Sequence, residues 1–162
     1  MLELITISEV NDDLAEMVAS FRVELRSYKG IVSRTNVDAG REEMEEYLVA
    51  GFPVFVAMVD GQYAGYVVCR VDSEVVWVES IFVKEEFRRH GVASALHRKA
   101  EDIAASYGDD TVYNYVHPNN HRMIEFLRKR GYTVLNLIEI RKPYKGERLT
   151  QAITVGEHEF DY

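Results

Sequence analysis

The residues best suited to chemistry in this sequence lie in a short loop, Arg88–Ala93, between a strand-like stretch and a helix-like one. The first turn of a helix has backbone N–H groups without partners and carries partial positive charge, so it can bind an anion. Gly91 and Ala93 are small enough to let a phosphate group approach that backbone, and Arg88 and Arg89 add cationic donors at the rim. The sequence contains neither a Walker A motif nor a G-x-G-x-x-G motif. The loop therefore predicts a pyrophosphate site without either of these nucleotide-binding signatures.

Glu79 is a second candidate for chemistry, because it is the one acid inside the otherwise apolar run Val75–Val83. A carboxylate in such a strand is costly unless it is paired or functional. It could act as a base that accepts a proton from a substrate. It could equally face an open cleft or pair with an arginine, and the sequence leaves both interpretations open.

The elements that must hold these residues can be predicted from apolar spacing and turn signals. The run Val75–Val83 predicts a strand covered on both faces, and the spacing after Gly91 predicts a helix that ends just before Gly108. Two β-rich runs, 54–59 and 63–71, predict a hairpin around an Asp-Gly turn. The other expected elements are a strand over 3–7, helices over 11–28 and 38–50, a strand over 111–116, a helix closed by Gly131, strands over 132–142 and 149–155 around a turn at 143–146, and a polar tail from about 157.

Two motifs resemble the signatures of the Gcn5-related N-acetyltransferase (GNAT) superfamily. The loop Arg88-x-x-Gly91-x-Ala93 is similar to that family's acetyl-CoA motif, Gln/Arg-x-x-Gly-x-Gly/Ala at the start of a helix. The stretch Asn120–Tyr132 resembles its second signature, Asn-x-x-Ala-x-x-Leu-Tyr-x-x-x-Gly-Phe. The resemblance covers the chain well from about residue 54 to the end of that second stretch, and less well at the two ends.

The resemblance implies an α/β fold: a mixed, mostly antiparallel sheet of about seven strands, helices on both faces, and a splay between the fourth and fifth strands. It implies transfer of an acetyl group from acetyl-CoA directly to a primary amine, without an acyl-enzyme. The acceptor would be a small-molecule amine or a protein N-terminus or lysine, and the sequence does not choose between these. The family's first two helices and the loop between them form part of the acceptor pocket, so Tyr28, Arg34 and Tyr47 could contact substrate, although ordinary core and surface roles explain them more simply. The alternative is a non-catalytic acyl-CoA-binding regulatory module on the same fold.

The resemblance also implies roles for particular residues. Acetyl-CoA would lie between the fourth and fifth strands, its pantetheine arm paired like an added strand with the backbone of Ile81, Phe82 and Val83. The pyrophosphate would be held by the backbone N–H groups of Arg88, Arg89, His90, Gly91, Val92, Ala93 and Ser94. Asn120 would contact the pantetheine arm, and a plain N-cap or turn role is an equal alternative. Glu79 would help to remove the amine proton, often through a water molecule.

Leu127 departs from the family pattern, which often has a tyrosine there that gives a proton to the departing thiolate. Leucine cannot do this, so another group substitutes, the thiolate leaves without a dedicated acid, or the chain has lost activity. Tyr113, Tyr115 and Tyr144 are replacements by general location only. They are more simply explained as strand and turn aromatics.

Length, composition and charge narrow the possible domain organisation, partners and location of the protein. A chain of 162 residues with 47% hydrophobic and 28% charged residues is ordinary for a globular protein, and we expect a single domain over 1–162. The net charge of −8 argues against nucleic acid; it would favour a cationic amine, although solubility explains it more simply. The single cysteine, Cys69, excludes an internal disulfide and gives no metal-ligand spacing, so we expect no metal. The absence of a long apolar run or signal peptide predicts a cytoplasmic protein without membrane contact, and a homodimer is a state common in the resembled family.

Overall fold

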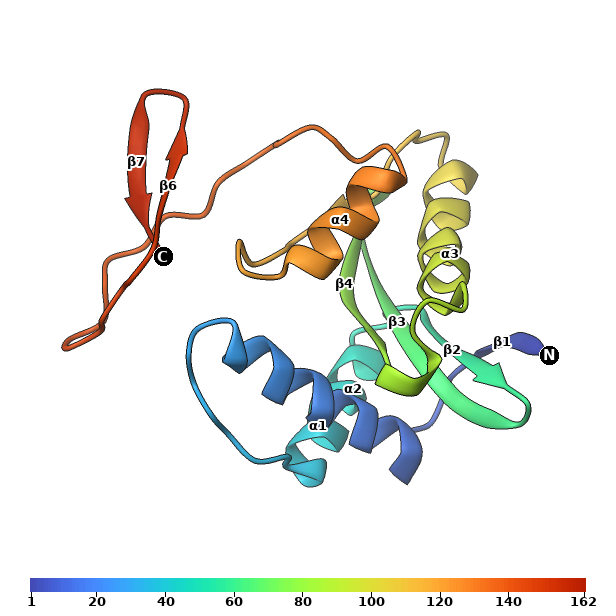
Figure 1. The fold of residues 1–162 in the computed structure, drawn as a ribbon. Helices are drawn as coiled ribbons and strands as arrows, with labels where there is room; N and C mark the ends of the chain where they lie inside the picture. Colours follow the sequence, from blue (N-terminus) through green and yellow to red (C-terminus); the bar gives the residue numbers. More distant parts are fainter. The chain divides into compact units, whose positions relative to one another are not determined.

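The fold consists of four α-helices and seven strands, and the computed structural model describes residues 1–162. In chain order the elements are β1 (Leu2–Thr6), α1 (Asp12–Ser27), α2 (Val37–Val49), β2 (Val54–Val59), β3 (Gln62–Asp72), β4 (Val75–Val83), a 3₁₀ turn (Glu85–Phe87), α3 (Val92–Ser106), β5 (Tyr113–Asn114), α4 (His121–Lys129), β6 (Ala152–Val155) and β7 (His158–Asp161). Strands β1 to β5 form one sheet in that order, antiparallel up to β4 and parallel between β4 and β5 (Figure 1). The predicted α/β fold with a mixed, mostly antiparallel sheet is confirmed, with five of the seven strands in this sheet and two in a separate hairpin.

The chain divides into two compact units, Met1–Tyr115 and Val116–Tyr162. The first unit contains the five-stranded sheet and α1 to α3, and the second contains α4 and the β6–β7 hairpin. None of the helices is both long and apolar enough to cross a membrane.

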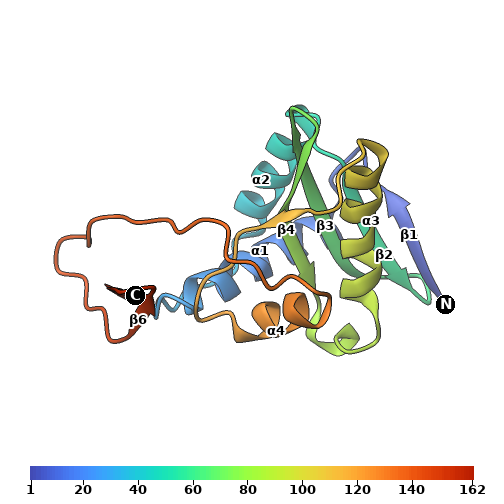
Figure 2. The ribbon, with the colours of Figure 1, turned by 90° about the horizontal axis from the view of Figure 1, so that it is seen from above.

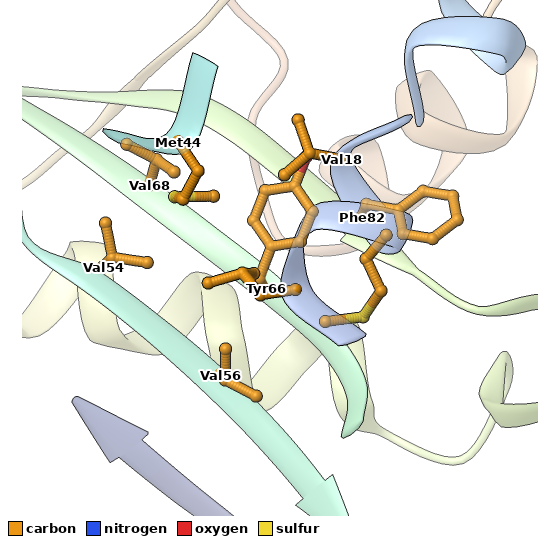
Figure 3. Packing of buried hydrophobic residues seen from close by; sticks show 9 residues of the cluster. Val18, Met44, Val54, Val56, Tyr66, Val68 and Phe82 are labelled. Atoms are coloured by element: carbon orange, nitrogen blue, oxygen red, sulfur yellow. The ribbon is translucent and has the colours of Figure 1, made fainter. Parts of the chain in front are cut away.

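Helices cover both faces of the five-stranded sheet. Helices α1 and α2 pack together on one face, and α3 packs against β2, β3 and β4 on the other (Figure 2). The core between the sheet and α1 and α2 is built from side chains that are almost completely buried: Leu14, Met17, Val18, Met44, Val54, Val56, Tyr66, Val68 and Phe82. Figure 3 shows the ring of Tyr66 among Val18, Met44 and Phe82. Burial of these apolar surfaces is the main force that holds the two helices on the sheet.

The hairpin between β2 and β3 forms where the sequence predicts it. Asp60 and Gly61 both have positive φ, at 48° and 81°, the pair of left-handed conformations that a tight two-residue hairpin turn requires. Aspartate and glycine tolerate this region better than other residues do. The turn fixes the register in which β2 and β3 pair, and so helps to position β4 on the other side of β3.

Strand β4 is less completely covered than its composition predicts. Buried and half-buried residues alternate along it, and Trp77, Glu79 and Ile81 are half-buried. The prediction that both faces are covered is therefore wrong at these positions. A composition rich in β-branched residues does not distinguish a strand with one open face from a strand with none.

The second unit differs most from the sequence predictions. The expected strand over 132–142 has no strand pairing, and its apolar side chains are exposed, with Val134 at 87% and Leu137 at 78%. A strand needs a partner for its backbone N–H and C=O groups, which the local sequence cannot supply. The expected strand over 149–155 is shortened to β6, and the residues predicted as a polar tail form β7, paired with β6. The predicted turn before it is present, with the N–H of Glu147 donating to the carbonyl of Tyr144.

Candidate active site

Helix α3 begins without a side-chain cap, in the loop that the sequence marks for an anion. Its N-cap residue is Gly91, with φ of 81°, and no side chain accepts a hydrogen bond from its first turn. The other three α-helices each begin with an asparagine whose side chain does accept such a bond: Asn11, Asn36 and Asn120. The backbone N–H groups of residues 89–94 have no protein acceptor, and the first turn of α3 has no acidic residue. A set of backbone donors at the positive end of a helix dipole is therefore open to an anion.

A second residue of this loop, besides Gly91, has a left-handed backbone conformation. Arg89 has φ of 63°, a left-handed conformation that non-glycine residues adopt infrequently. Its side chain is exposed, as is that of His90. Two left-handed residues, Arg89 and Gly91, thus turn the chain within four residues from the end of the 3₁₀ turn into α3.

Arg88 is placed differently from the prediction that it supplies a cation at the rim. Its Nε donates to the carbonyl oxygen of Val83 at 2.8 Å, and one terminal nitrogen donates to Glu24 Oε2 at 3.0 Å. Its backbone N–H donates to the carbonyl of Glu85 at 3.2 Å. The donors of Arg88 therefore tie the loop to the end of β4 and to α1, and Arg89 is the exposed cation of the loop.

The last part of β4 presents unpaired backbone groups on the side away from β3. The N–H of Lys84 donates to the carbonyl of Ala64, and in an antiparallel pair the bonded positions alternate, so Phe82 bonds to β3 whereas Ile81 and Val83 do not. A Cβ built on Gly65 would lie 3.2 Å from the Cα of Val83, the close approach of a non-bonded pair. The backbone of Ile81 and of Val83 thus points toward the β5 side.

The sheet divides at this part of β4. Strand β5 pairs with β4 only at Trp77 and Val78, which lie opposite Tyr113 and Asn114. Residues 79–83 of β4 continue without a partner strand on that side. The predicted splay between the fourth and fifth strands is therefore present, and it opens beside the start of α3.

A β-bulge lies at the point of division. Val68 of β3 lies opposite Ser80, but the next residue, Cys69, lies opposite Val78, so Glu79 is the extra residue of β4. A bulge interrupts the alternation of a strand and can turn a side chain toward the other face. Strict alternation from Ser80 would point Glu79 toward the α3 face.

The bulge instead places the Glu79 carboxylate on the face covered by α1 and α2. Its Oε2 lies 3.0 Å from Nε of Arg70, which is two residues from Val68 and shares its face. The Arg70 N–H is not directed at that oxygen, so the contact is an ion pair without a hydrogen bond. The Arg70 guanidinium also lies over the Trp77 ring, 4.3 Å from its centroid. The arginine partner that the sequence left as an alternative is thus present, and the two side chains remain 30% and 28% exposed.

A groove of about 430 Å³ is formed by residues of α1 and α2. It is lined by Arg22, Ala39, Glu42, Glu43, Glu46 and Tyr47. Within it, the Tyr47 hydroxyl donates to Glu43 Oε1 at 2.9 Å, and Arg22 pairs with Glu43 Oε2 at 3.1 Å. Burial, the charge of Glu43 and, more weakly, the charge of Glu79 raise the pKa of Tyr47 well above its usual value. The charge of Glu79 thus acts on Tyr47, one of the residues that line the groove.

Residues 19–132 match the family model described as "Acetyltransferase (GNAT) family". The chain belongs to this family. The match includes β4, the Gly91 loop and α3, so the family resemblance predicted from the two motifs is confirmed.

Individual relatives of this GNAT protein agree with the assignment. An uncharacterized N-acetyltransferase, MJ1207, of Methanocaldococcus jannaschii is 33% identical over 85 residues, which are 48% of this chain and 38% of the relative. The aminoglycoside N-acetyltransferase AAC(6')-Iy in complex with CoA is 24% identical, with a TM-score of 0.65 over 88% of this chain and 95% of that one. The PaiA N-acetyltransferase of Thermoplasma acidophilum, in complex with coenzyme A, is 17% identical, with a TM-score of 0.64 over 80% and 88%. The two solved structures share the fold of this chain.

The second GNAT signature lies in the second unit. Asn120 is the N-cap of α4, and its side chain accepts a hydrogen bond from the N–H of Met123 at 3.2 Å. The capping role that the sequence left as an alternative is present, and the contact with a pantetheine arm stays a prediction. Leu127, where the family often has tyrosine, is buried with 7% of its surface exposed.

The three tyrosines considered as replacements have separate surroundings. Tyr113 packs its ring against Trp77, with the centroids 5.6 Å apart, beside the bulge of β4. Tyr115 is 67% exposed, and Tyr144 is 66% exposed with the Arg141 guanidinium over its ring. Tyr113 is thus the one that the structure places next to β4 in the first unit.

Several residues of the site are not visible in the sequence pattern. Glu79 pairs with Arg70, Arg88 pairs with Glu24, and the Tyr66 hydroxyl bonds to Ser80. The partners are 9 to 64 residues apart along the chain. No local spacing signals such contacts, because they depend on which strands and helices become neighbours.

Proposed function

We propose that this GNAT protein is an N-acetyltransferase that moves an acetyl group from acetyl-CoA directly to a primary amine. The observation that carries the proposal is the uncapped glycine start of α3 beside the unpaired end of β4, in a chain of this family. Acetyl-CoA supplies the acetyl group as an activated thioester.

Two sets of backbone groups would hold the donor. The N–H groups of residues 89–94 suit the pyrophosphate, because they are free, lie at a helix N-terminus and have Arg89 beside them. Ile81 and Val83 suit the pantetheine arm as the positions whose backbone points away from β3. Since the Val83 carbonyl accepts from Arg88, its N–H is the group left to bind. The backbone of Phe82 instead bonds to β3, and its side chain packs in the core, so Phe82 is not proposed to pair with the pantetheine arm.

Glu79 would accept the proton that the amine loses. Only a neutral amine has a lone pair to attack the acetyl carbon, so a base near the acceptor is required at neutral pH. The bulge directs Glu79 toward the α1 and α2 face, and its carboxylate is partly exposed and thus accessible to an amine or a bridging water. Glu79 would take one proton from the ammonium before the attack. As the C–N bond formed and the C–S bond broke, CoA would leave as a thiolate, and the second proton lost by the nitrogen would neutralise that thiolate.

The acceptor would approach from the face that carries the α1 and α2 groove. The groove lining has three carboxylates and one guanidinium, and Glu42 and Glu46 are exposed without an ion pair. Such a lining favours an acceptor with positive charge besides the reacting amine. A panel of monoamines and diamines of similar length tests this: Glu46→Gln should raise KM for diamines and leave KM for monoamines unchanged.

Calorimetry with CoA and acetyl-CoA tests the donor site. Gly91→Glu places a carboxylate where the pyrophosphate would bind, so we expect wild type to bind both ligands and the variant to bind neither. The substitution also forces a side chain into a left-handed position, and the matched control is Gly108→Glu. Gly108 has φ of 82°, lies at the other end of α3 and likewise has open space at its Cβ. Failure of folded wild type to bind CoA, or equal loss in both variants, would refute the site.

The second candidate function is a non-catalytic acyl-CoA-binding module. Leu127 favours it, because the chain lacks the family's usual proton donor at this position. Release of free thiol in the presence of an amine panel separates the two: CoA binding without turnover supports the module.

A further inference from the structure

His97 is a wholly buried histidine in α3, the helix that begins at the Gly91 loop, and the proposed reaction does not use it. Its Nδ1 lies 3.2 Å from Glu101 Oε1 and its Nε2 lies 3.2 Å from Asn114 Oδ1. Burial of a polar ring is costly, and packing alone would be served better by an apolar side chain. The two polar contacts of the ring therefore call for an explanation.

The hydrogen-bond roles follow from the partners. The Asn114 amide nitrogen donates to the carbonyl of Val112 at 3.3 Å, which directs the amide oxygen toward His97. That oxygen can only accept, so Nε2 donates to it. An ionised Glu101 also only accepts, so Nδ1 donates as well. Both bonds are made together when both ring nitrogens carry protons.

Asn114 occupies a special place in the sheet. It is the last residue of β5 and lies opposite Val78, directly before the bulge at Glu79. Beyond it, β4 has no partner strand on that side. The bond between His97 and Asn114 thus joins the helix that carries the anion loop to the strand residue at which the opening begins.

We propose that His97 is a positioning residue that clamps the end of β5 to α3 and so fixes where the sheet divides and how wide the cofactor opening is. That the opening holds a cofactor rests on the proposed function. The clamp itself is a property of α3 and β5, and can be measured without any ligand.

The test compares His97→Leu with Asn114→Ala, which break the same bond from its two ends. We expect either change to weaken CoA binding about tenfold, as for the loss of one hydrogen bond. Either change should also speed amide hydrogen exchange at positions 113 and 114. The double variant should bind CoA no more weakly than the weaker-binding single variant, because each single change already removes the bond. In wild type, Nε2 of His97, the nitrogen that donates to Asn114, should give the ¹⁵N shift of a protonated nitrogen.

Leu96→Val is the matched control, since Leu96 is equally buried on α3 and adjacent in sequence. It should lower stability yet leave CoA affinity and exchange in β5 unchanged. Unchanged exchange in β5 in both clamp variants, an Nε2 without a proton, or equal loss of affinity in Leu96→Val would overturn the proposal. If wild type fails to bind CoA, the proposed function fails, while the exchange and ¹⁵N measurements still decide the clamp.

Discussion

At the scale of single residues, the direction and the charge environment of the Glu79 carboxylate depend on the β4 bulge and on Arg70. The bulge gives it a direction, and Arg70 gives it a counter-charge at 3.0 Å. The ion pair stabilises a carboxylate in a half-buried strand, where an unpaired acid would be costly. The contact is partly exposed, which leaves the carboxylate accessible to a substrate.

Glu79→Gln should lower kcat by about 100-fold or more, because glutamine keeps the shape of the side chain but cannot accept the amine proton. CoA affinity should stay the same, since the donor site uses other groups. Steady-state kinetics by thiol release, together with calorimetry, measure the two effects. Glu74→Gln, at the exposed turn before β4, is the control and should be without effect. Unchanged turnover in Glu79→Gln would remove the residue from the mechanism.

At the scale of elements, α3 differs from the other three α-helices in how its first turn is capped. Asparagine side chains satisfy the first turns of α1, α2 and α4, whereas α3 begins with a glycine and free N–H groups. A capped helix start is stabilised by its own side chain, and an uncapped one keeps its donors for a ligand.

Asn120→Ala should reduce the free energy of unfolding by about 1 kcal/mol, as expected for the loss of an N-cap. Asn120→Ser keeps a capping oxygen and should restore that stability. Urea unfolding measures the stability, and calorimetry on both variants tests the pantetheine contact that the family resemblance implies. CoA affinity that recovers fully in the serine variant would leave Asn120 with a capping role alone.

The contact between α1 and α2 depends on Gly40. A Cβ at this position would lie 2.4 Å from the carbonyl oxygen of Ala15 and 2.8 Å from the backbone nitrogen of Ala19. Gly40→Ala should therefore destabilise the protein by about 1–3 kcal/mol, through forced separation of the helices. An unhindered helix would instead gain about 0.5–1 kcal/mol from the same change. Urea unfolding decides the sign, with Glu45→Ala at an exposed site of α2 as a control expected to be near neutral.

At the scale of the whole molecule, the buried core sets how stability responds to alkaline pH. Burial raises the pKa of the Cys69 thiol from 9.0 to about 12. Above pH 9 the unfolded chain loses this proton while the folded chain keeps it, so the unfolded state becomes favoured as pH rises. Burial also raises the pKa of Tyr66 well above its usual value, which adds to the loss at higher pH.

The free energy of unfolding should thus fall by about 1.4 kcal/mol per pH unit on account of Cys69 as pH rises from about 9 toward 12. Urea unfolding of wild type and of Cys69→Ala at pH 8, 9 and 10 measures this difference. The alanine variant should lose stability less steeply between pH 9 and 10. If the free energy of unfolding fell equally steeply with pH in both proteins, the pKa of Cys69 would not differ between the folded and unfolded states, and the prediction would be wrong.

The sequence by itself determined the order of elements in the first unit and the glycine start of α3. Asp60-Gly61 and Gly91 could be interpreted directly, because a tight hairpin and an open helix start depend on local backbone freedom. The tertiary structure alone decided the bulge at Glu79, the Arg70 counter-charge, the inward turn of Arg88 and the lack of a strand over 132–142. Each of these depends on which backbone or side chain becomes a neighbour across the fold. Spacing along one chain carries no information about such a partner.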